Sequence, residues 1–308
     1  MSRVLTLASL LLISAAAMAQ TSILRPAITA ISHITLYADD LAKSQKFYGS
    51  LIGWEQMPEG AQRSGLRFYA NHFQYIRLVL APRPGIDDRL IDVGFVTKDA
   101  EALRQFLHEN GVTVPDAVRK DSDGGKHFDV ADPEGNKIEF VQAGTPFAKP
   151  PQSTSQQLSS HIIHVGFVVR NRELVDHFYK DLLGFHLYWQ GGASAGHTDW
   201  VMMQVPDGTD WLEYMLYLPA APTRGQLGSA NHFSPGVSSV AELTEKLRRR
   251  GWVPSEGEHL SLLGVDGKLQ LAMVDPDGTR AEFMEFAPVK KPCCALYTGP
   301  QPTPSTDW

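Results

Sequence analysis

The hydrophobic pattern of this chain predicts short strands that alternate with amphipathic helices. Apolar runs at residues 31–37 and 162–169 each predict a strand. After the second run, Leu174, Phe178 and Leu182 recur at the spacing of one helix face. Strands and hairpins follow, and then a further strand and helix on the same plan. Each half of the chain therefore predicts the order βαβββ twice, which gives four such units and an α+β fold.

Cap residues place the ends of the first helix in each half. Asp40 and Asn171 are the predicted N-caps, since their side chains accept hydrogen bonds from free N–H groups. Gly53 and Gly184 are predicted to end the same two helices. The later helices are predicted at 100–110 and 240–250.

The two halves are copies of one long repeat. The phrase His-Ile-Thr-Leu at His33 corresponds to His-Val-Gly-Phe at His164, 131 residues later. The turn Asp-Pro-Glu-Gly at Asp132 returns as Asp-Pro-Asp-Gly at Asp275, 143 residues later. The predicted segments are a signal peptide at 1–19, module one at 28–144, a linker rich in Pro, Ser and Gln at 145–160, module two at 161–288, and an irregular tail at 289–308.

The first residues predict export. Arg3 precedes an apolar run at 4–17, and small residues stand before a predicted cut after Ala19. The run is too short for a membrane-spanning helix that the mature protein keeps. We therefore expect a secreted or periplasmic protein without a membrane anchor. Glutathione and coenzyme A are chiefly cytoplasmic, so export disfavours substrates that carry them.

Charge excludes one class of partner. The chain has 28 Lys and Arg against 34 Asp and Glu, and its formal net charge is −6. Acidic and basic residues are mixed along it, so nucleic-acid binding is not predicted. Cys293 and Cys294 are the only cysteines and are adjacent. They could form a vicinal disulfide, pair with another chain or take up metal, and a structural or incidental role is favoured.

Four residues of the second half suggest chemistry. His164 and His232 lie 68 residues apart, and Glu213 and Glu282 lie 69 apart. A pseudo-symmetric fold would bring these two imidazoles and two carboxylates together as an open site for one divalent metal. Zn, Ni, Mn, Fe and Co all suit such mixed ligands.

The ordered set of motifs resembles the vicinal oxygen chelate superfamily, which includes glyoxalase I, drug resistance proteins and extradiol dioxygenases. The set comprises a histidine on the first strand, the Phe-Tyr-x-x-Leu-Leu-Gly-Phe phrase at Phe178, and an Asp-Pro-x-Gly hairpin before an apolar-Glu-apolar strand. The resemblance covers about residues 28–288 and implies two modules with curved mixed sheets.

The resemblance implies metal ligands on the first, fourth, fifth and eighth strands of a module. In module two these positions are His164, Glu213, His232 and Glu282, in the order of the glyoxalase I type. In module one they are His33, Arg77, Asp92 and Glu139. Arginine has no lone pair to offer a metal, so module one is expected to be a structural partner.

Some relatives exchange half-units between modules. Such an exchange would combine His164 and Glu213 with Asp92 and Glu139, so this alternative stays open beside the unexchanged site.

By resemblance, the expected function is a metal-dependent, glyoxalase-like lyase or isomerase that acts on a small oxygen-chelating substrate. The metal would act as a Lewis acid, with Glu282, or alternatively Glu213, moving a proton. Trp211, Trp200 and Phe233 are candidate pocket residues, whereas His161, His177, His186, His197 and His259 are expected at the surface or around the site.

Two other functions stay open. An extradiol-type dioxygenase would use His164, His232 and Glu282, but Glu213 would occupy a position that oxygen or a catechol needs. A protein that binds a small molecule or drug without catalysis is the other alternative. With two fused modules, either a monomer or a homodimer is reasonable.

Overall fold

The computed structural model describes residues 24–58, 65–121, 124–144, 156–194, 196–255 and 259–304. The predicted signal peptide and most of the predicted linker lie outside these ranges, so both stay predictions. Among the described residues, no helix has the length and apolar character needed to cross a membrane.

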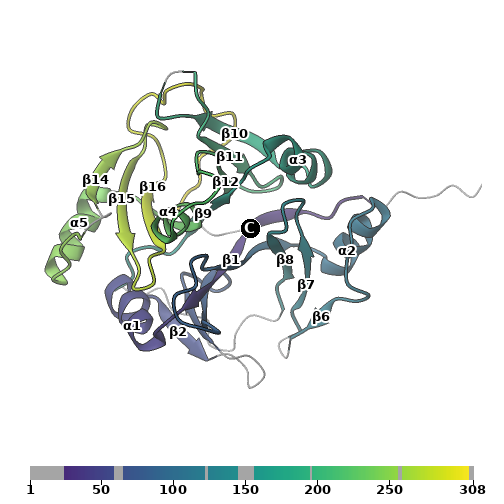
Figure 1. Ribbon diagram of the computed structural model, residues 1–308, viewed down its shortest axis with the longest axis horizontal. Coiled ribbons are helices and arrows are strands. Elements are labelled where there is room, and N and C mark those ends of the chain that lie inside the picture. Colours follow the sequence, from purple (N-terminus) through teal and green to yellow (C-terminus); the bar gives the residue numbers. More distant parts are fainter. Residues whose placement is uncertain are drawn as a thin grey trace, which may run out of the picture.

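Each module is built on one eight-stranded mixed sheet, and the two modules pack against each other (Figure 1). The predicted α+β fold is confirmed. Module one contains β1 (Ile28–Ala38), α1 (Leu41–Gln45), η1 (Lys46–Ile52), β2 (Glu55–Pro58), β3 (Leu66–Tyr69), β4 (Tyr75–Leu80), β5 (Leu90–Thr97), α2 (Ala100–Glu109), β6 (Arg119–Lys120), β7 (Lys126–Ala131) and β8 (Lys137–Gln142). Module two contains β9 (Ile162–Val168), α3 (Arg172–Asp176), η2 (His177–Leu182), β10 (His186–Gly191), β11 (Trp200–Gln204), β12 (Trp211–Met215), α4 (Arg224–Ala230), β13 (His232–Val237), α5 (Val240–Arg249), β14 (His259–Leu263), β15 (Leu269–Val274) and β16 (Arg280–Glu285).

The strand order decides how half-units combine. It is β2-β3-β4-β1-β5-β8-β7-β6 in one sheet and β10-β11-β12-β9-β13-β16-β15-β14 in the other. The first strands of the two half-units, β9 and β13, meet antiparallel in the centre, and β12 and β16 flank them in parallel. Both half-units of a module therefore share one sheet, and no exchange occurs between modules.

The predicted N-caps are present, but each of the two helices that they begin changes from an α-helix to a π-helix after five residues. Asp40 accepts hydrogen bonds from the backbone N–H groups of Ala42 and Lys43, and Asn171 accepts one from Leu174. The chain then continues as the π-helices η1 and η2. η1 ends directly before Gly53, as predicted, whereas η2 ends at Leu182 and is capped by Leu183, one residue before Gly184. Both glycines adopt positive φ values, 87° at Gly53 and 80° at Gly184.

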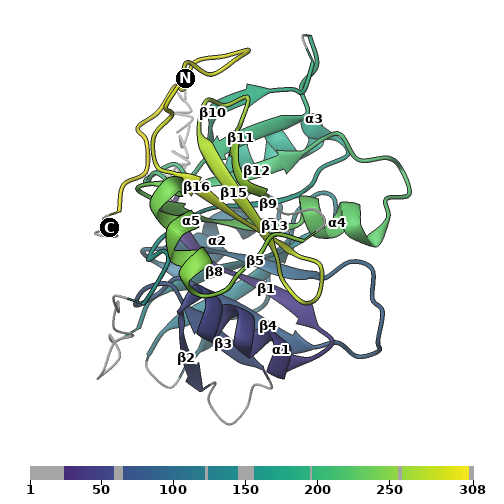
Figure 2. The same ribbon diagram turned by 90° about the vertical axis from the view of Figure 1, so that its left-hand side faces the viewer.

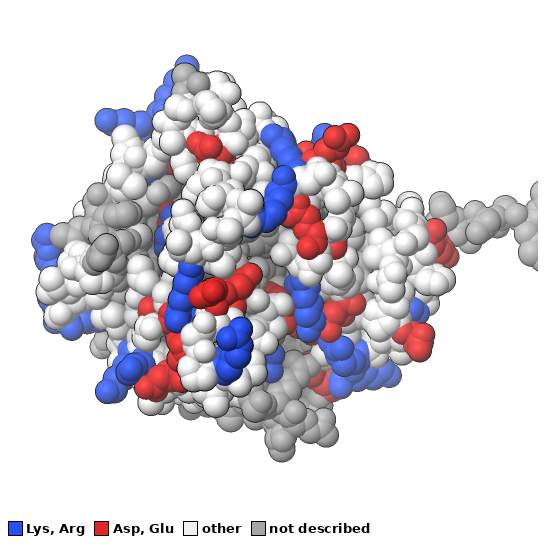
Figure 3. Space-filling model, viewed as in Figure 1, with Lys and Arg blue, Asp and Glu red and all other residues white. Residues whose placement is uncertain are grey.

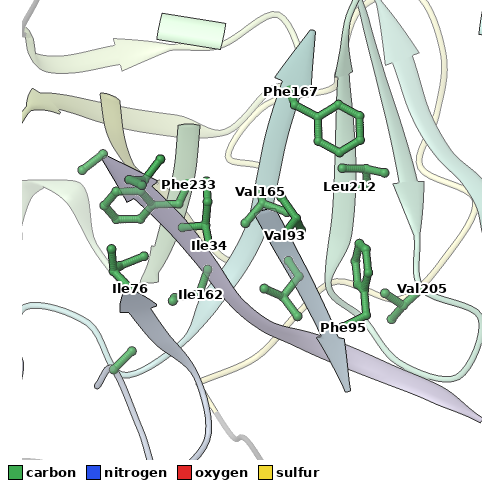
Figure 4. Close-up of a cluster of buried hydrophobic side chains, with 14 of the residues drawn as sticks. Ile34, Ile76, Val93, Phe95, Ile162, Val165, Phe167, Val205, Leu212 and Phe233 are labelled. Carbon is green, nitrogen blue, oxygen red and sulfur yellow. The ribbon is translucent and has the colours of Figure 1, made fainter. Parts of the chain in front are cut away.

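The core lies between the modules. Apolar residues of both sheets meet there, among them Ile34, Phe95, Val165, Leu212 and Phe233 (Figure 4). The turns found by repeat analysis lock this interface. Tyr48 of module one donates a hydrogen bond to Asp275 at 2.8 Å, and Tyr179 of module two donates one to Asp132 at 3.2 Å.

The C-terminal residues fold back onto module two. We call residues 288–304 the strap; it contains no helix or strand. Figure 2 shows this yellow segment along the outer side of module two, beside β10 and β16. Cys293 and Cys294 form a disulfide within it. A short helix, α4, was not predicted; its capping box joins Thr223 and Gln226.

Candidate metal centre

The predicted His-Glu-His-Glu set comes from four neighbouring strands of module two. Glu213 lies on β12, His164 on β9, His232 on β13 and Glu282 on β16, and these strands are adjacent in that order. Their side chains converge on the face of the sheet opposite to the one that packs into the core between the modules, and we call this face the cup. All four are buried, with exposures of 0% for the two histidines and 5% for each glutamate.

The distances fit ligation of a single ion. The two imidazole Nε2 atoms are 2.9 Å apart. His232 Nε2 lies 3.3 Å from Glu213 Oε2, and His164 Nε2 lies 3.5 Å from Glu282 Oε2. One ligand atom from each residue falls within 4.8 Å of the others. Ligand atoms with metal bonds of about 2.1 Å lie roughly 3.0–3.4 Å apart, so the set can surround a metal.

Hydrogen bonds prepare one histidine for this role. Nδ1 of His232 lies 2.8 Å from the carbonyl oxygen of Ala230 and donates to it, which leaves the Nε2 lone pair toward the centre. The backbone also makes room, because a Cβ on Gly166 would come within 2.3 Å of the His232 ring. Thus the glycine in His-Val-Gly-Phe is required by the neighbouring imidazole.

The two glutamates differ electrostatically. Burial alone would raise the pKa of Glu282, but the charge of Arg280 and hydrogen bonds from His164 and His232 hold this pKa well below its usual value. Arg280 Nη1 donates to Glu282 Oε1 at 2.8 Å. Sequence analysis missed Arg280, although its place two residues before Glu282 on one strand puts both on the same face.

The corresponding position in module one holds a network of side-chain charges. His33 Nε2 lies 3.3 Å from Asp92 and 3.1 Å from Glu139. Lys137 lies 3.6 Å from Asp92, and Arg119 lies 3.4 Å from Glu139. Cations thus already neutralise these carboxylates. Among the described residues, only the module-two set forms a cluster able to hold a metal.

The candidate pocket residues divide between the two faces of the sheet. The Trp211 ring lies 4.8 Å from the His164 ring, so it borders the centre. Trp200 is half-buried and packs against the cluster of buried apolar side chains that contains Trp211. Phe233 instead packs against Trp54 of module one at 6.0 Å. Phe233 follows His232 directly on a strand, and alternation turns it into the core.

His161 also differs from expectation. It is fully buried, and its Nε2 lies 2.7 Å from Asp210 Oδ1. The carboxylate of Asp210 also accepts hydrogen bonds from the Ile31 N–H and from Gln74, both in module one. His161 therefore belongs to the module interface rather than to the surface or the metal centre.

The chain belongs to the Glyoxalase/Bleomycin resistance protein/Dioxygenase superfamily, whose sequence profile matches residues 30–140 and 161–283. This confirms the resemblance found in the sequence. No curated protein matches the chain.

Solved structures share the fold at low identity. Homoprotocatechuate 2,3-dioxygenase from Arthrobacter globiformis is 18% identical with a TM-score of 0.64, covering 86% of this chain and 81% of its own. The 2,3-dioxygenase LapB from Pseudomonas sp. KL28 is 17% identical with a TM-score of 0.64, covering 91% and 96%. An extradiol ring-cleaving dioxygenase from B. fuscum is 18% identical with a TM-score of 0.62, covering 85% and 73%.

Proposed function

We propose that the module-two centre binds one divalent metal and that the protein is a lyase or isomerase acting on a small molecule with adjacent oxygens. The observation that carries the proposal is the buried set of two imidazoles and two carboxylates within one ligand shell. Two buried carboxylates with only one arginine beside them favour a further cation. Four protein ligands leave room for a bidentate substrate on a six-coordinate ion.

A metal in this centre would supply Lewis-acid polarisation of a substrate carbonyl. The chain itself must then move the proton next to that carbonyl, and a carboxylate at the centre is placed to do so. The Arg280 contact makes Glu282 a weak base, which favours Glu213. Glu213 would take the proton from one substrate carbon and return it to the neighbouring carbon.

An extradiol-type dioxygenase is the second candidate. The structural likeness to 2,3-dioxygenases favours it, and His164, His232 and Glu282 supply two imidazoles and one carboxylate. Glu213 is the discriminating residue, because as a fourth protein ligand it reduces the space for both a catechol and oxygen.

The first experiment measures metal by mass spectrometry on the mature protein, purified without chelator or affinity tag. We expect about one divalent metal per chain, lost in His232→Ala and kept in Asp92→Ala, the matched variant of module one. Failure to bind Zn, Ni, Mn, Fe or Co when each is added would contradict the metal centre and favour a metal-free binding protein.

A second experiment separates the two reaction classes. Hydroxyacetone, which has adjacent oxygens, is incubated with metal-loaded protein in D2O and followed by NMR. Exchange of the proton next to the carbonyl, lost in Glu213→Gln, supports a lyase or isomerase. Oxygen uptake with catechol and Fe(II), without exchange in hydroxyacetone, would establish the dioxygenase instead.

A further inference from the structure

Beyond the metal ligands, the cup contains buried hydrogen-bond donors that have no partner. Trp211 and Tyr188 are both fully buried, and their rings lie 5.4 Å apart. Neither the Trp211 Nε1–H nor the Tyr188 hydroxyl has a hydrogen-bond partner. Buried donors are seldom left unpaired in native proteins, so a ligand or water is expected to meet them.

A buried cation lies beside these donors. Lys268 is fully buried, and its Nζ lies 5.2 Å from the centre of the Trp211 ring. One of its three N–H groups donates to the carbonyl oxygen of Phe286 at 2.6 Å. Burial lowers the pKa of Lys268 to about 7, and the charge of Asp266 opposes this shift. An anion bound nearby would keep the ammonium group charged.

The strap supplies the outer wall of this region. The Tyr297 ring lies 4.7 Å from the Tyr188 ring and 5.5 Å from Lys268 Nζ. Its hydroxyl donates to Asp266, which fixes the ring in place. The walls are therefore aromatic, and the polar groups beside them are the two unpaired donors, the Lys268 cation and the Asp266 carboxylate that Tyr297 binds.

We propose that Tyr188, Trp211 and Lys268 form a subsite for an anionic acceptor group, such as a carboxylate, on the substrate whose adjacent oxygens reach the metal. This inference rests on the proposed function. Trp211 connects the two regions, because the same ring lies 4.8 Å from the His164 ring, 5.4 Å from the Tyr188 ring and 5.2 Å from Lys268 Nζ. The aromatic walls favour a flat, apolar body between the two polar ends of the substrate.

The test uses a chelator that neither proposed reaction consumes. Benzohydroxamate and its 3-carboxy and 4-carboxy derivatives are titrated calorimetrically into the full-length mature protein loaded with Zn²⁺. We expect at least one carboxylate derivative to bind about tenfold more tightly than benzohydroxamate, as a charged hydrogen-bonded contact provides.

Variants then assign that gain to the subsite. Tyr188→Phe removes one oxygen and Lys268→Met removes the charge at similar length; each should reduce the gain to about threefold or less while benzohydroxamate binds as before. Tyr214→Phe is the matched control, since Tyr214 is buried on the opposite face of the same sheet, against Tyr179. It should keep the full gain.

Two results would overturn the subsite: equal binding of all three probes to the wild type, or a gain that both variants retain. Water alone filling the region would give the first result, and a carboxylate contact elsewhere on the protein would give the second. Benzoate titrated into metal-free protein separates the two proposals. Tighter binding by the wild type than by Tyr188→Phe supports the subsite even where no metal binds, and equal binding counts against it.

Discussion

Glu213 and Glu282 offer equivalent oxygens to the centre but differ in what holds their side chains. Arg280 binds the second oxygen of Glu282 at 2.8 Å and stabilises its charged form. Such a carboxylate is suited to stay on a metal and unsuited to accept a proton. The initial assignment of Glu282 as the base is untested, and the Arg280 contact argues for the alternative.

The two glutamine variants should therefore behave differently. Glu213→Gln should retain metal and lower the exchange rate by about 10²–10⁴-fold, as removal of a general base does. Glu282→Gln should mainly weaken metal binding, by about 10–100-fold. Exchange by NMR and metal titration by calorimetry measure the two effects. Full exchange in Glu213→Gln, with loss in Glu282→Gln at saturating metal, would restore Glu282 as the base.

The charge network of module one predicts a pH dependence of stability. Burial alone would lower the pKa of His33, but hydrogen bonds to Asp92 and Glu139 raise it above 6.5. Glu139 is buried, yet hydrogen bonds from His127 and His33 hold its pKa well below 4.5. Protonated His33 thus contributes stability that is full below pH 6.5 and lost as pH rises through the raised value. The carboxylate contributes stability above pH 4.5 that is lost on acidification through its lowered value.

Urea unfolding between pH 4 and 9 measures this dependence. The unfolding free energy should be largest between pH 4.5 and pH 6.5 and should decline above pH 6.5, up to the raised pKa of His33. His33→Gln should flatten the decline on the alkaline side, while Tyr217→Phe, at a position 44% exposed, should leave the profile unchanged. An unaltered alkaline decline in His33→Gln would mean that other groups cause it.

At the scale of elements, pairing of β9 with β13 fixes the position of His232. Gly166 lies opposite His232 in this ladder, and the imidazole occupies the space where a side chain would begin. Module one shows the same relation between Gly94 on β5 and His33 on β1. In each module, a glycine without a side chain thus leaves the space that one histidine ring occupies.

Gly166→Ala should displace the His232 ring and weaken metal binding by about 10–100-fold, comparable to loss of a residue that orients a ligand. Gly94→Ala is the control, because its added methyl group would meet His33 instead and should leave metal affinity unchanged. An equal loss of metal affinity in both variants would show that a lower stability of the whole protein causes the effect, rather than displacement of His232. Metal titration and thermal unfolding on the same samples distinguish these outcomes.

Repeat analysis predicted that four side chains come together, because the spacing is preserved between half-units, and the structure brings them within 4.8 Å of one another. His164, Glu213, His232 and Glu282 could be recognised from sequence alone as a group. Contacts between distant segments could not be predicted from the sequence. Lys268 contacts Tyr297 only because the strap folds back onto module two. His161 contacts Asp210 at the interface where the two modules pack together. Phe233 was misplaced because it is the sequence neighbour of His232, whereas strand alternation turns it to the opposite face of the sheet, into the core.

At the scale of the whole molecule, the modules are joined by reciprocal polar contacts within an apolar interface. The tyrosine in each Phe-Tyr phrase binds the aspartate that begins the last hairpin of the other module. Each aspartate also accepts backbone N–H groups within its own turn. The repeated motifs therefore act in pairs, one copy completing the other.

Removing these hydroxyls should cost stability additively. Tyr48→Phe and Tyr179→Phe should each lower the free energy of unfolding by about 1–3 kcal/mol, since a buried carboxylate loses a donor. The double variant should show the sum, because the two contacts share no partner. Tyr217→Phe should change it by less than about 0.5 kcal/mol. Urea denaturation measures the free energy of unfolding of all four variants. If the double variant were as stable as either single variant, the two contacts would not be independent.

The strap also has a consequence for the order in which the protein is completed. All strands of module two precede it in the chain, while its residues bind β10, the loop before β15 and the Gln204 side chain. Because synthesis runs toward the C-terminus, every strand of the module-two sheet has been made before the strap that packs against Tyr188 and Lys268. Docking of the strap is therefore the last step in completing this side of module two, and Tyr297 reaches Tyr188 only at that step.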